Sequence, residues 1–483
     1  MTAKQAFNPY LPSYEYVPDA EPHIVNGRVY IYGSHDLFNG LNFCLGDYVC
    51  WSAPVEDLGN WRYEGCIYKR EQDPVAPRFR LTNGLAAPDM VQGQDGRYYL
   101  YYFMGGTKMI SVAVCDEPAG KYEFYGYVKY EDLVPVGRKN EPFQFDPGIF
   151  MDDDGRLYLY SGFALAGNPI LLDGSKPTEH GPMCFELDSS DMLTVKKGPV
   201  YIGVAGEKEA AGTPYEGHPF LEASSMRKFN GTYYFIYSSL NSHELCYATS
   251  SNPTGDFAYG GILVSNGDIG MPGVTDVNHA RNYTGNTHGS IIEINGEYYV
   301  FYHRHSNRKQ SSRQACAEKI RFEDGIFYQA ELTSCGLNGK PLSGKGHYPS
   351  YIACNLYGKK GTRFLSMIKH SKKGYPFFTQ EGGDRESGDD QYIANMADGA
   401  VAGFKYFDLR GTSRIRINIR GNASGTVYIR TSEDQHPAAK IEVKPTKDVH
   451  GFAAELKVPG EKQALFFKYE GKGSFDFISF DLA

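Results

Sequence analysis

Five ionisable residues each stand seven to nine positions before a glycine that follows Asn or Asp. They are Asp19, Asp89, Asp146, Glu222 and His288. Converging carboxylates repel one another, and the cost of that repulsion suggests a functional purpose. Paired carboxylates suit the cleavage of a glycosidic bond, because one must stay protonated to donate to the leaving oxygen while another is ionised. Crowding like charges in a cleft pushes their pKa values apart and so produces both states.

The glycines belong to five similar segments, in which an Asn-Gly or Asp-Gly turn separates an apolar run from an aromatic-rich run. Both dipeptides are strong hairpin signals, because the central residues of a type I′ turn need positive φ. Glycines 27, 96, 155, 231 and 296 are spaced by 69, 59, 76 and 65 residues, which suits four-stranded blades with long loops. The spacing predicts a five-bladed β-propeller, with an unrelated run of hairpins in a sandwich as the alternative. The five ionisable residues then lie at the starts of the innermost strands, at one mouth of the central channel.

Composition agrees with an all-β chain. Of 483 residues, 38 are Tyr, 29 are Phe and 55 are Gly, and 41% are hydrophobic, which is enough to bury a large core. A net charge of −8 argues against a nucleic-acid partner, and no apolar run approaches a membrane span. The N-terminal residues lack an apolar signal core, so we expect a cytoplasmic protein. The nine cysteines include no Cys-x-x-Cys pair, so we expect reduced, packed thiols.

The hairpin repeat stops after Gly336, and a different pattern follows. Short strands with period-2 alternation predict a β-sandwich of jelly-roll type. We therefore expect two domains, a catalytic propeller over residues 1–337 and an accessory sandwich over residues 338–483. The order of strands in the second domain resembles carbohydrate-binding module family 6, although both tryptophans, Trp51 and Trp61, lie in the propeller. We expect this domain to pack on the propeller and to lend a loop such as 375–390 to the substrate pocket.

The propeller resembles glycoside hydrolase family 43, which comprises inverting β-xylosidases, α-L-arabinofuranosidases and arabinanases. Three segments carry the resemblance: Asp19-Ala-Glu-Pro-His-Ile with Tyr32-Gly-Ser34, Phe145-Asp-Pro-Gly-Ile-Phe, and Glu222-Ala-Ser-Ser-Met-Arg-Lys. The resemblance implies that Asp19 is the general base on water and Glu222 the general acid. It also implies that Asp146 raises the pKa of Glu222 and orients it.

Two other carboxylates compete for these roles. The family's usual proline follows Glu21 rather than Asp19, and Glu216-Gly-His218-Pro superficially matches the acid segment. The distance to the turn glycine favours Asp19 and Glu222.

The resemblance also implies that Asp89 and His288 help to bind the substrate. Arg281 and Arg304 are candidates to contact sugar hydroxyls, with a surface or structural role as the alternative for each. No cofactor is expected to be required, but calcium or another ion could lie near His288, as it does in some members. His303 and His305 share one face of a strand, yet two ligands are too few for a metal, so we expect an edge-strand pair.

Together these observations predict an exo-acting, inverting hydrolase that releases α-L-arabinofuranosyl or β-D-xylosyl units from oligosaccharides. A non-catalytic carbohydrate-binding propeller is one alternative. A galactose-releasing or fructan-active propeller hydrolase is the other.

Overall fold

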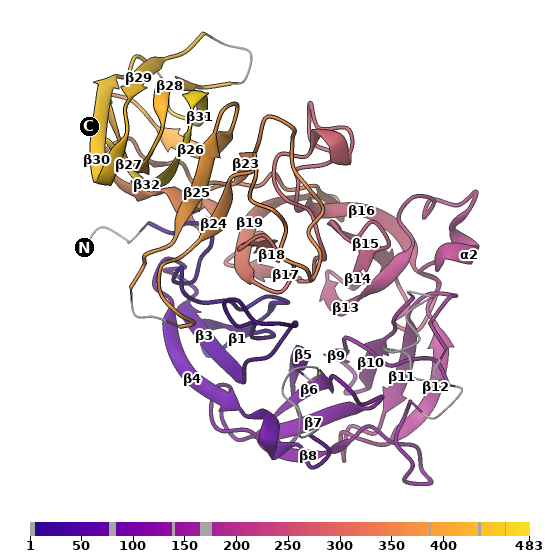
Figure 1. Cartoon of the computed structure of the whole chain (residues 1–483). Helices are drawn as coiled ribbons and strands as arrows, with labels where there is room; N and C mark the ends of the chain where they lie inside the picture. Colours follow the sequence, from indigo (N-terminus) through magenta and orange to yellow (C-terminus); the bar gives the residue numbers. More distant parts are fainter. Residues whose placement is uncertain are drawn as a thin grey trace.

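The computed structural model describes residues 5–76, 84–137, 141–164, 176–385, 388–432, 436–458 and 460–483. These ranges form five four-stranded sheets followed by two six-stranded sheets, so the prediction of a five-bladed propeller and a β-sandwich is confirmed (Figure 1). Within the described ranges, no helix has the length and apolar character that crossing a membrane would take.

Each blade consists of four consecutive antiparallel strands. Blade 1 contains β1 (Glu21–Val25), β2 (Arg28–Tyr32), β3 (Tyr48–Pro54) and β4 (Arg62–Tyr68). Blade 2 contains β5 (Leu85–Gln92), β6 (Tyr98–Met104), β7 (Ile110–Cys115) and β8 (Glu123–Tyr127). Blade 3 contains β9 (Gly148–Met151), β10 (Leu157–Ser161), β11 (Met183–Leu187) and β12 (Val195–Tyr201). Blade 4 contains β13 (Phe220–Phe229), β14 (Thr232–Ser239), β15 (Glu244–Ser250) and β16 (Ala258–Ser265). Blade 5 contains β17 (Ile291–Ile294), β18 (Glu297–His305), β19 (Arg313–Glu323) and β20 (Ile326–Tyr328).

The predicted turns join the first two strands of every blade, but they are not all of one type. Asn26, Asn230 and Asn295 have positive φ like the glycines that follow them, as a type I′ turn requires. Asp95 does not have positive φ. Its carboxylate accepts a hydrogen bond from the N–H of Arg97, and the N–H of Gly93 donates to the carbonyl of Arg97, which makes this loop wider. The Asp154 turn has the same form.

The first strands of the blades surround the axis. Strand β1 contacts β5 and β17, and β9 contacts β5 and β13. The ring closes without exchanging a strand: Ala20 bridges Gly289 in parallel, and Tyr10 N–H donates to Ala315 O. A shared apolar cluster, which includes Trp51 and Phe301, joins the first and last blades.

The C-terminal domain is a sandwich of two sheets. One contains β21 (Leu342–Ser343), β26 (Val401–Asp408), β31 (Gln463–Lys472), β28 (Ser424–Arg430) and β29 (Ala439–Val443), with β23 (Asn355–Tyr357) also on β26. The other contains β24 (Phe377–Thr379), β25 (Tyr392–Ala397), β32 (Ser474–Leu482), β27 (Arg414–Gly421) and β30 (Thr446–Glu455), with β22 (Gly346–Pro349) also on β32. Phe404 and Phe467 of the first sheet pack on Phe477 and Phe480 of the second.

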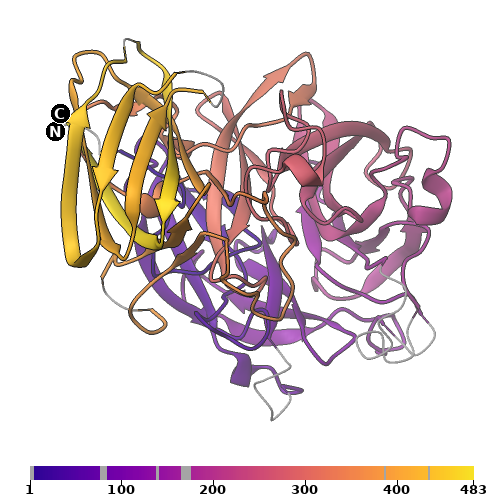
Figure 2. The ribbon, with the colours of Figure 1, turned by 45° about the horizontal axis from the view of Figure 1, so that its top comes forward.

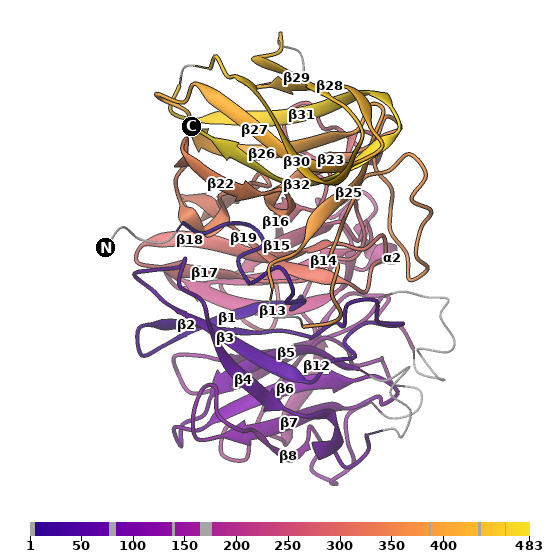
Figure 3. The same ribbon diagram turned by 60° about the vertical axis from the view of Figure 1, so that its left-hand side comes forward.

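The two domains are tightly joined. Figures 2 and 3 show the sandwich lying against the fifth and first blades. The buried ammonium of Lys405 pairs with Asp268 at 3.0 Å and with Glu331 at 2.9 Å. Strand β20 ends at Tyr328 and β21 begins at Leu342, so the expected domain division falls in the segment between them.

Candidate active site

Unusual backbone geometry marks the starts of the inner strands. Asp19 and Asp146, two residues before β1 and β9, have φ of 59° and 46°. Ala223, which follows Glu222 in β13, has φ of 68°. Positive φ in residues other than glycine costs free energy and clusters at functional sites. The three predicted acids therefore occupy, or adjoin, strained positions at the same end of three blades.

Asp19 is buried and held by an arginine from the last blade. Its Oδ1 accepts a hydrogen bond of 2.8 Å from Nη1 of Arg313, at the start of β19. The same guanidinium grips both carboxylate oxygens of Asp36, at 2.8 and 3.0 Å. Burial raises the pKa of Asp19, and the positive charge of Arg313 opposes that rise. The arginine therefore favours the ionised carboxylate that a general base needs.

The surroundings of Glu222 favour the protonated form, in contrast to those of Asp19. It is partly exposed, and no described residue makes a hydrogen bond to its carboxylate. Burial and the negative charges of Asp146 and Asp19 raise the pKa of Glu222 to about 8. At neutral pH the side chain therefore carries a proton, as a general acid must.

Asp146 connects Glu222 to His288. One Asp146 oxygen accepts the N–H of Ala223 at 3.2 Å and lies 3.4 Å from Nδ1 of His288. Although burial opposes it, Asp146 raises the pKa of His288 to about 9, so the imidazole is cationic at neutral pH. Asp146 thus fixes the backbone beside the acid and places a balanced pair of charges next to it.

Asp89 and Glu21 lie together in the channel rather than with the three acids. Asp89 accepts from His23 Nε2 at 2.8 Å and from the Ile149 N–H at 2.9 Å, and so links blades 1 and 3. Arg227 holds Glu21 at 2.5 Å. Burial and the charge of Asp89 raise the pKa of Glu21 to about 7. The arrangement favours Asp19 over Glu21 as the base.

The groups around His288 offer few free ligands for a calcium ion. Calcium takes oxygen ligands, and the Asp146 oxygen nearest His288 is already engaged by its imidazole at 3.4 Å. The nearest other carboxylate, Glu21, lies 4.0 Å from His288 through Oε1, which has no hydrogen-bond partner among the described residues, while Oε2 pairs with Arg227. Two cationic side chains therefore supply positive charge in this part of the channel.

Arg304 and Arg281 lie between the propeller and the C-terminal domain. Arg304 donates to the carbonyls of Tyr351 and Ala353 at 2.6 and 3.2 Å, and stacks on Phe378. Side chains alternate along a strand, so Arg304 points away from the face on which His303 approaches Asp19. Arg281 donates to the hydroxyl of Tyr357 at 3.3 Å.

Sequence reasoning missed two residues of the site. No motif distinguishes Arg313 or Asp36, and only the pairing of the first and last blades brings them to Asp19. The edge-strand interpretation of His303 is wrong, since β18 pairs with both β17 and β19. His303 is fully buried, with Nδ1 3.4 Å from Asp19, and burial and Arg313 lower its pKa well below the ordinary value. The sequence signal for this position was the alternation of His303 and His305, which places both side chains on one face of the strand.

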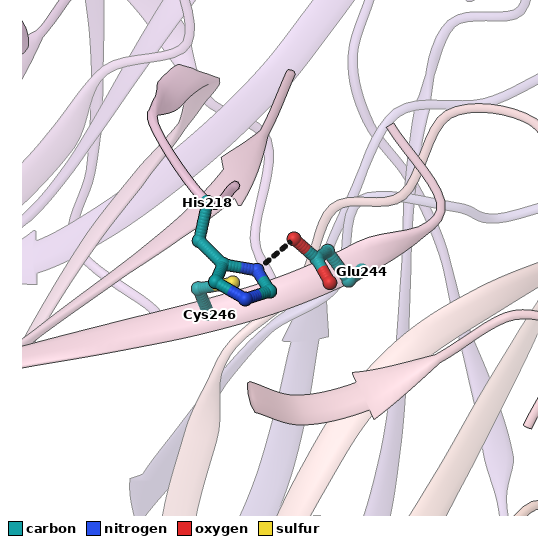
Figure 4. A group of neighbouring side chains, drawn as sticks. All are labelled: His218, Glu244 and Cys246. Atoms are coloured by element: carbon teal, nitrogen blue, oxygen red, sulfur yellow. Dashed lines mark hydrogen bonds and ion pairs between the residues drawn. The ribbon is translucent and has the colours of Figure 1, made fainter. Parts of the chain in front are cut away.

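The competing segment at Glu216 has a structural role. Glu216 is exposed and accepts the N–H of Gly212 in a turn. Figure 4 shows the neighbouring His218 beside Glu244 and Cys246. Glu244 Oε1 accepts from His218 at 2.6 Å and from two further side chains, Ser239 and Asn241.

This donor set would suit zinc, but its groups are already engaged. Burial raises the pKa of the Cys246 thiol well above its usual range, so the sulfur keeps its proton. We interpret the cluster as a hydrogen-bonded network that fixes the starts of β13 and β15, and with them Glu222.

Comparison with known proteins gives consistent matches. The model of glycosyl hydrolases family 43 matches residues 15–327. A xylosidase/arabinosidase of Thermoclostridium stercorarium is 50% identical over 484 residues, which cover 99% of each chain. A xylosidase/arabinosidase of Bacteroides ovatus is 30% identical over 61% of this chain and 87% of its own.

Two solved structures are similar in fold. A β-xylosidase/α-arabinofuranosidase from a compost metagenome, in complex with xylotriose and calcium-free, is 27% identical with a TM-score of 0.50. The match covers 66% of this chain and 96% of that one. An arabinoxylan arabinofuranohydrolase of Bacillus subtilis, in complex with cellotetraose, is 19% identical with a TM-score of 0.50. It covers 99% of this chain and 97% of its own, so the likeness extends through both domains.

Proposed function

The chain belongs to glycosyl hydrolases family 43, and we propose that this glycosidase is exo-acting and inverting. Its substrates are (arabino)xylo-oligosaccharides, from which it releases α-L-arabinofuranosyl and β-D-xylosyl units. The xylosidase/arabinosidases with which the chain aligns support pentose substrates.

One observation carries the proposal: the site keeps one carboxyl group protonated and clamps another to an arginine. Asp19 takes a proton from water, whose oxygen attacks the anomeric carbon as the bond to the leaving oxygen breaks. Glu222 gives its proton to that leaving oxygen. Asp146 holds the backbone beside Glu222 and, with Asp19, raises the pKa of its carboxyl group.

We propose that no metal is required for this reaction, because Arg227 pairs with Glu21 and His288 pairs with Asp146 in the channel. We also propose that residues 338–483 form an accessory domain resembling a carbohydrate-binding module. Its main role is to pack on the propeller, as the contacts of Arg304 and Lys405 support.

Replacing Glu222 by Gln tests the proposal. We expect kcat for xylobiose, whose leaving oxygen must be protonated, to fall by about 100-fold or more, since general acid catalysis contributes on this order. A nitrophenyl pentoside, whose leaving group needs little protonation, should lose much less. Glu216→Gln is the matched control and should leave kcat unchanged, because Glu216 lies in an exposed turn.

The wild-type product provides the second test. NMR of the first-formed anomer should show inversion at the anomeric carbon. Retention would overturn the single-displacement mechanism, and binding of oligosaccharides without turnover would identify a lectin instead.

A further inference from the structure

A loop of the C-terminal domain lies over the face of the propeller that carries the acids. Residues 358–376 join β23 to β24, and in Figure 1 this orange segment extends from the sandwich across blade 5 toward the centre of the ring. The loop is fixed there by hydrogen bonds to three propeller segments. Leu365 N–H donates to Thr284 O at 2.8 Å, Gln310 N–H to Ser366 O at 2.9 Å, and Lys369 Nζ to Asn39 Oδ1 at 2.8 Å.

Each of these three segments continues into a residue that organises the acids. Thr284 lies four residues before His288, and Gln310 lies three residues before Arg313. Asn39 lies three residues after Asp36. The loop therefore borders the site, and any part of a substrate that projects from the acids on this side meets it.

The loop is strongly basic in a chain of net charge −8. It contains six Lys and Arg residues and no Asp or Glu. Two more cations, Arg308 and Lys309, lie on the propeller segment beneath it. In the part of the chain that the structure describes, only Lys359 of these eight pairs with a carboxylate, that of Asp398.

Three of the cations are close enough to repel one another. Burial lowers the pKa of Lys369, and the positive charges of Arg308 and Lys309 lower it further. Lys309 is only 5% exposed, and its ammonium donates to the carbonyl of Gly40 rather than to an acid. A cluster of cations that makes no ion pair with a carboxylate of the described residues, with one buried member and others partly or fully exposed beside an active site, suggests that an anion binds there.

Two exposed apolar side chains flank the cations. Ile368, next to Lys369, is 79% exposed, and Leu41, two residues from Asn39, is 70% exposed. Apolar surface beside fixed positive charge suits a ligand that carries both a carboxylate and apolar C–H faces. A sugar with a carboxyl group has this combination, whereas an inorganic anion has no apolar face.

We propose that the 358–376 loop and Lys309 form a subsite for a uronic acid branch on the oligosaccharide substrate. This inference rests on the proposed function, because it places the branch on the portion of the chain that extends from the scissile bond. The C-terminal domain then selects acidic xylo-oligosaccharides, and the propeller performs the hydrolysis.

A matched pair of ligands tests the subsite: xylotriose with one glucuronic acid branch, and unbranched xylotriose. Calorimetric titration at low ionic strength should show the branched ligand binding about tenfold more tightly, as one charge-assisted contact allows. The preference should vanish at about 0.5 M salt, because salt at this concentration screens the attraction between exposed charges. The titrations use protein that carries Glu222→Gln, so that neither ligand is cleaved during the measurement and the result does not depend on the proposed hydrolysis.

Lys369→Gln should remove most of the preference and leave binding of unbranched xylotriose unchanged. Lys447→Gln, an exposed lysine on β30 at the far edge of the sandwich, is the matched control and should keep it. Equal affinity for the two ligands in protein with an intact loop would overturn the proposal. Equal weakening of both ligands by Lys369→Gln would overturn it as well.

Discussion

Asp146 and His288 carry opposite charges beside the same two carboxyl groups. Removing Asp146 should therefore shift the pH profile in one direction, and removing His288 should shift it in the other. Asp146 raises the pKa of both Glu222 and Asp19, and His288 lowers both. Glu222 must be protonated, so its pKa sets the alkaline limb of kcat/KM, and Asp19 must be ionised, so its pKa sets the acidic limb. Asp146→Asn should therefore move both limbs to lower pH, and His288→Gln should move both to higher pH.

The structure gives the size of the effect. The rise in the pKa of Glu222 from 4.5 to about 8 corresponds to about 5 kcal/mol in favour of the protonated form. Asp146 bonds the residue next to Glu222. For two charges at a separation on the order of 7 Å, Coulomb's law gives about 2 kcal/mol at an effective dielectric constant of about 20. The alkaline limb of Asp146→Asn should therefore move down by about one to two pH units, because about 1.4 kcal/mol corresponds to one unit of pKa.

The assay is kcat/KM for xylobiose, whose leaving oxygen depends on the acid, between about pH 4 and pH 10, with His279→Gln as the control. His279 is an exposed histidine paired with Asp276, so its replacement should leave the profile unchanged. Shifts of the alkaline limb in the same direction for Asp146→Asn and His288→Gln, or no shift in either variant, would contradict the charge effects assigned to these two residues.

Three further predictions concern the supports of the site. Arg313→Lys keeps the charge but loses the forked guanidinium that binds Asp19 and Asp36. We expect kcat to fall about 100-fold and the free energy of unfolding, measured with urea, to fall by about 3 kcal/mol. An unchanged kcat would contradict the role given to Arg313. Arg304→Met should lower the free energy of unfolding by about 3 kcal/mol, because the carbonyls of Tyr351 and Ala353 lose their donor. Its kcat should stay near wild type, and a raised KM without loss of stability would place Arg304 at the substrate instead. Dialysis against EDTA should leave kcat unchanged, and a loss restored by calcium would refute the metal-free proposal.

The sequence by itself determined the blades and the approximate place of the site. Asn-Gly and Asp-Gly turns are local signals, because positive φ at the turn depends on the residue itself. The positions seven to nine residues before the turn glycines lie near the starts of the inner strands. There the structure brings Asp19, Asp146 and His288 close enough to Glu222 for their charges to shift its pKa. Aromatic period-2 runs likewise identified both β domains.

Only the tertiary structure decided what surrounds those residues. Arg313 lies 294 residues from Asp19 and has no local motif, so nothing short of the closed ring reveals the contact. Arg304 is one residue from His303, yet the pleat of β18 turns it to the domain interface. The basic loop of residues 358–376 reads as a surface connection until its hydrogen bonds to Thr284, Gln310 and Asn39 place it over the acids. Such contacts depend on how distant strands pack, and local sequence patterns carry no information about that packing.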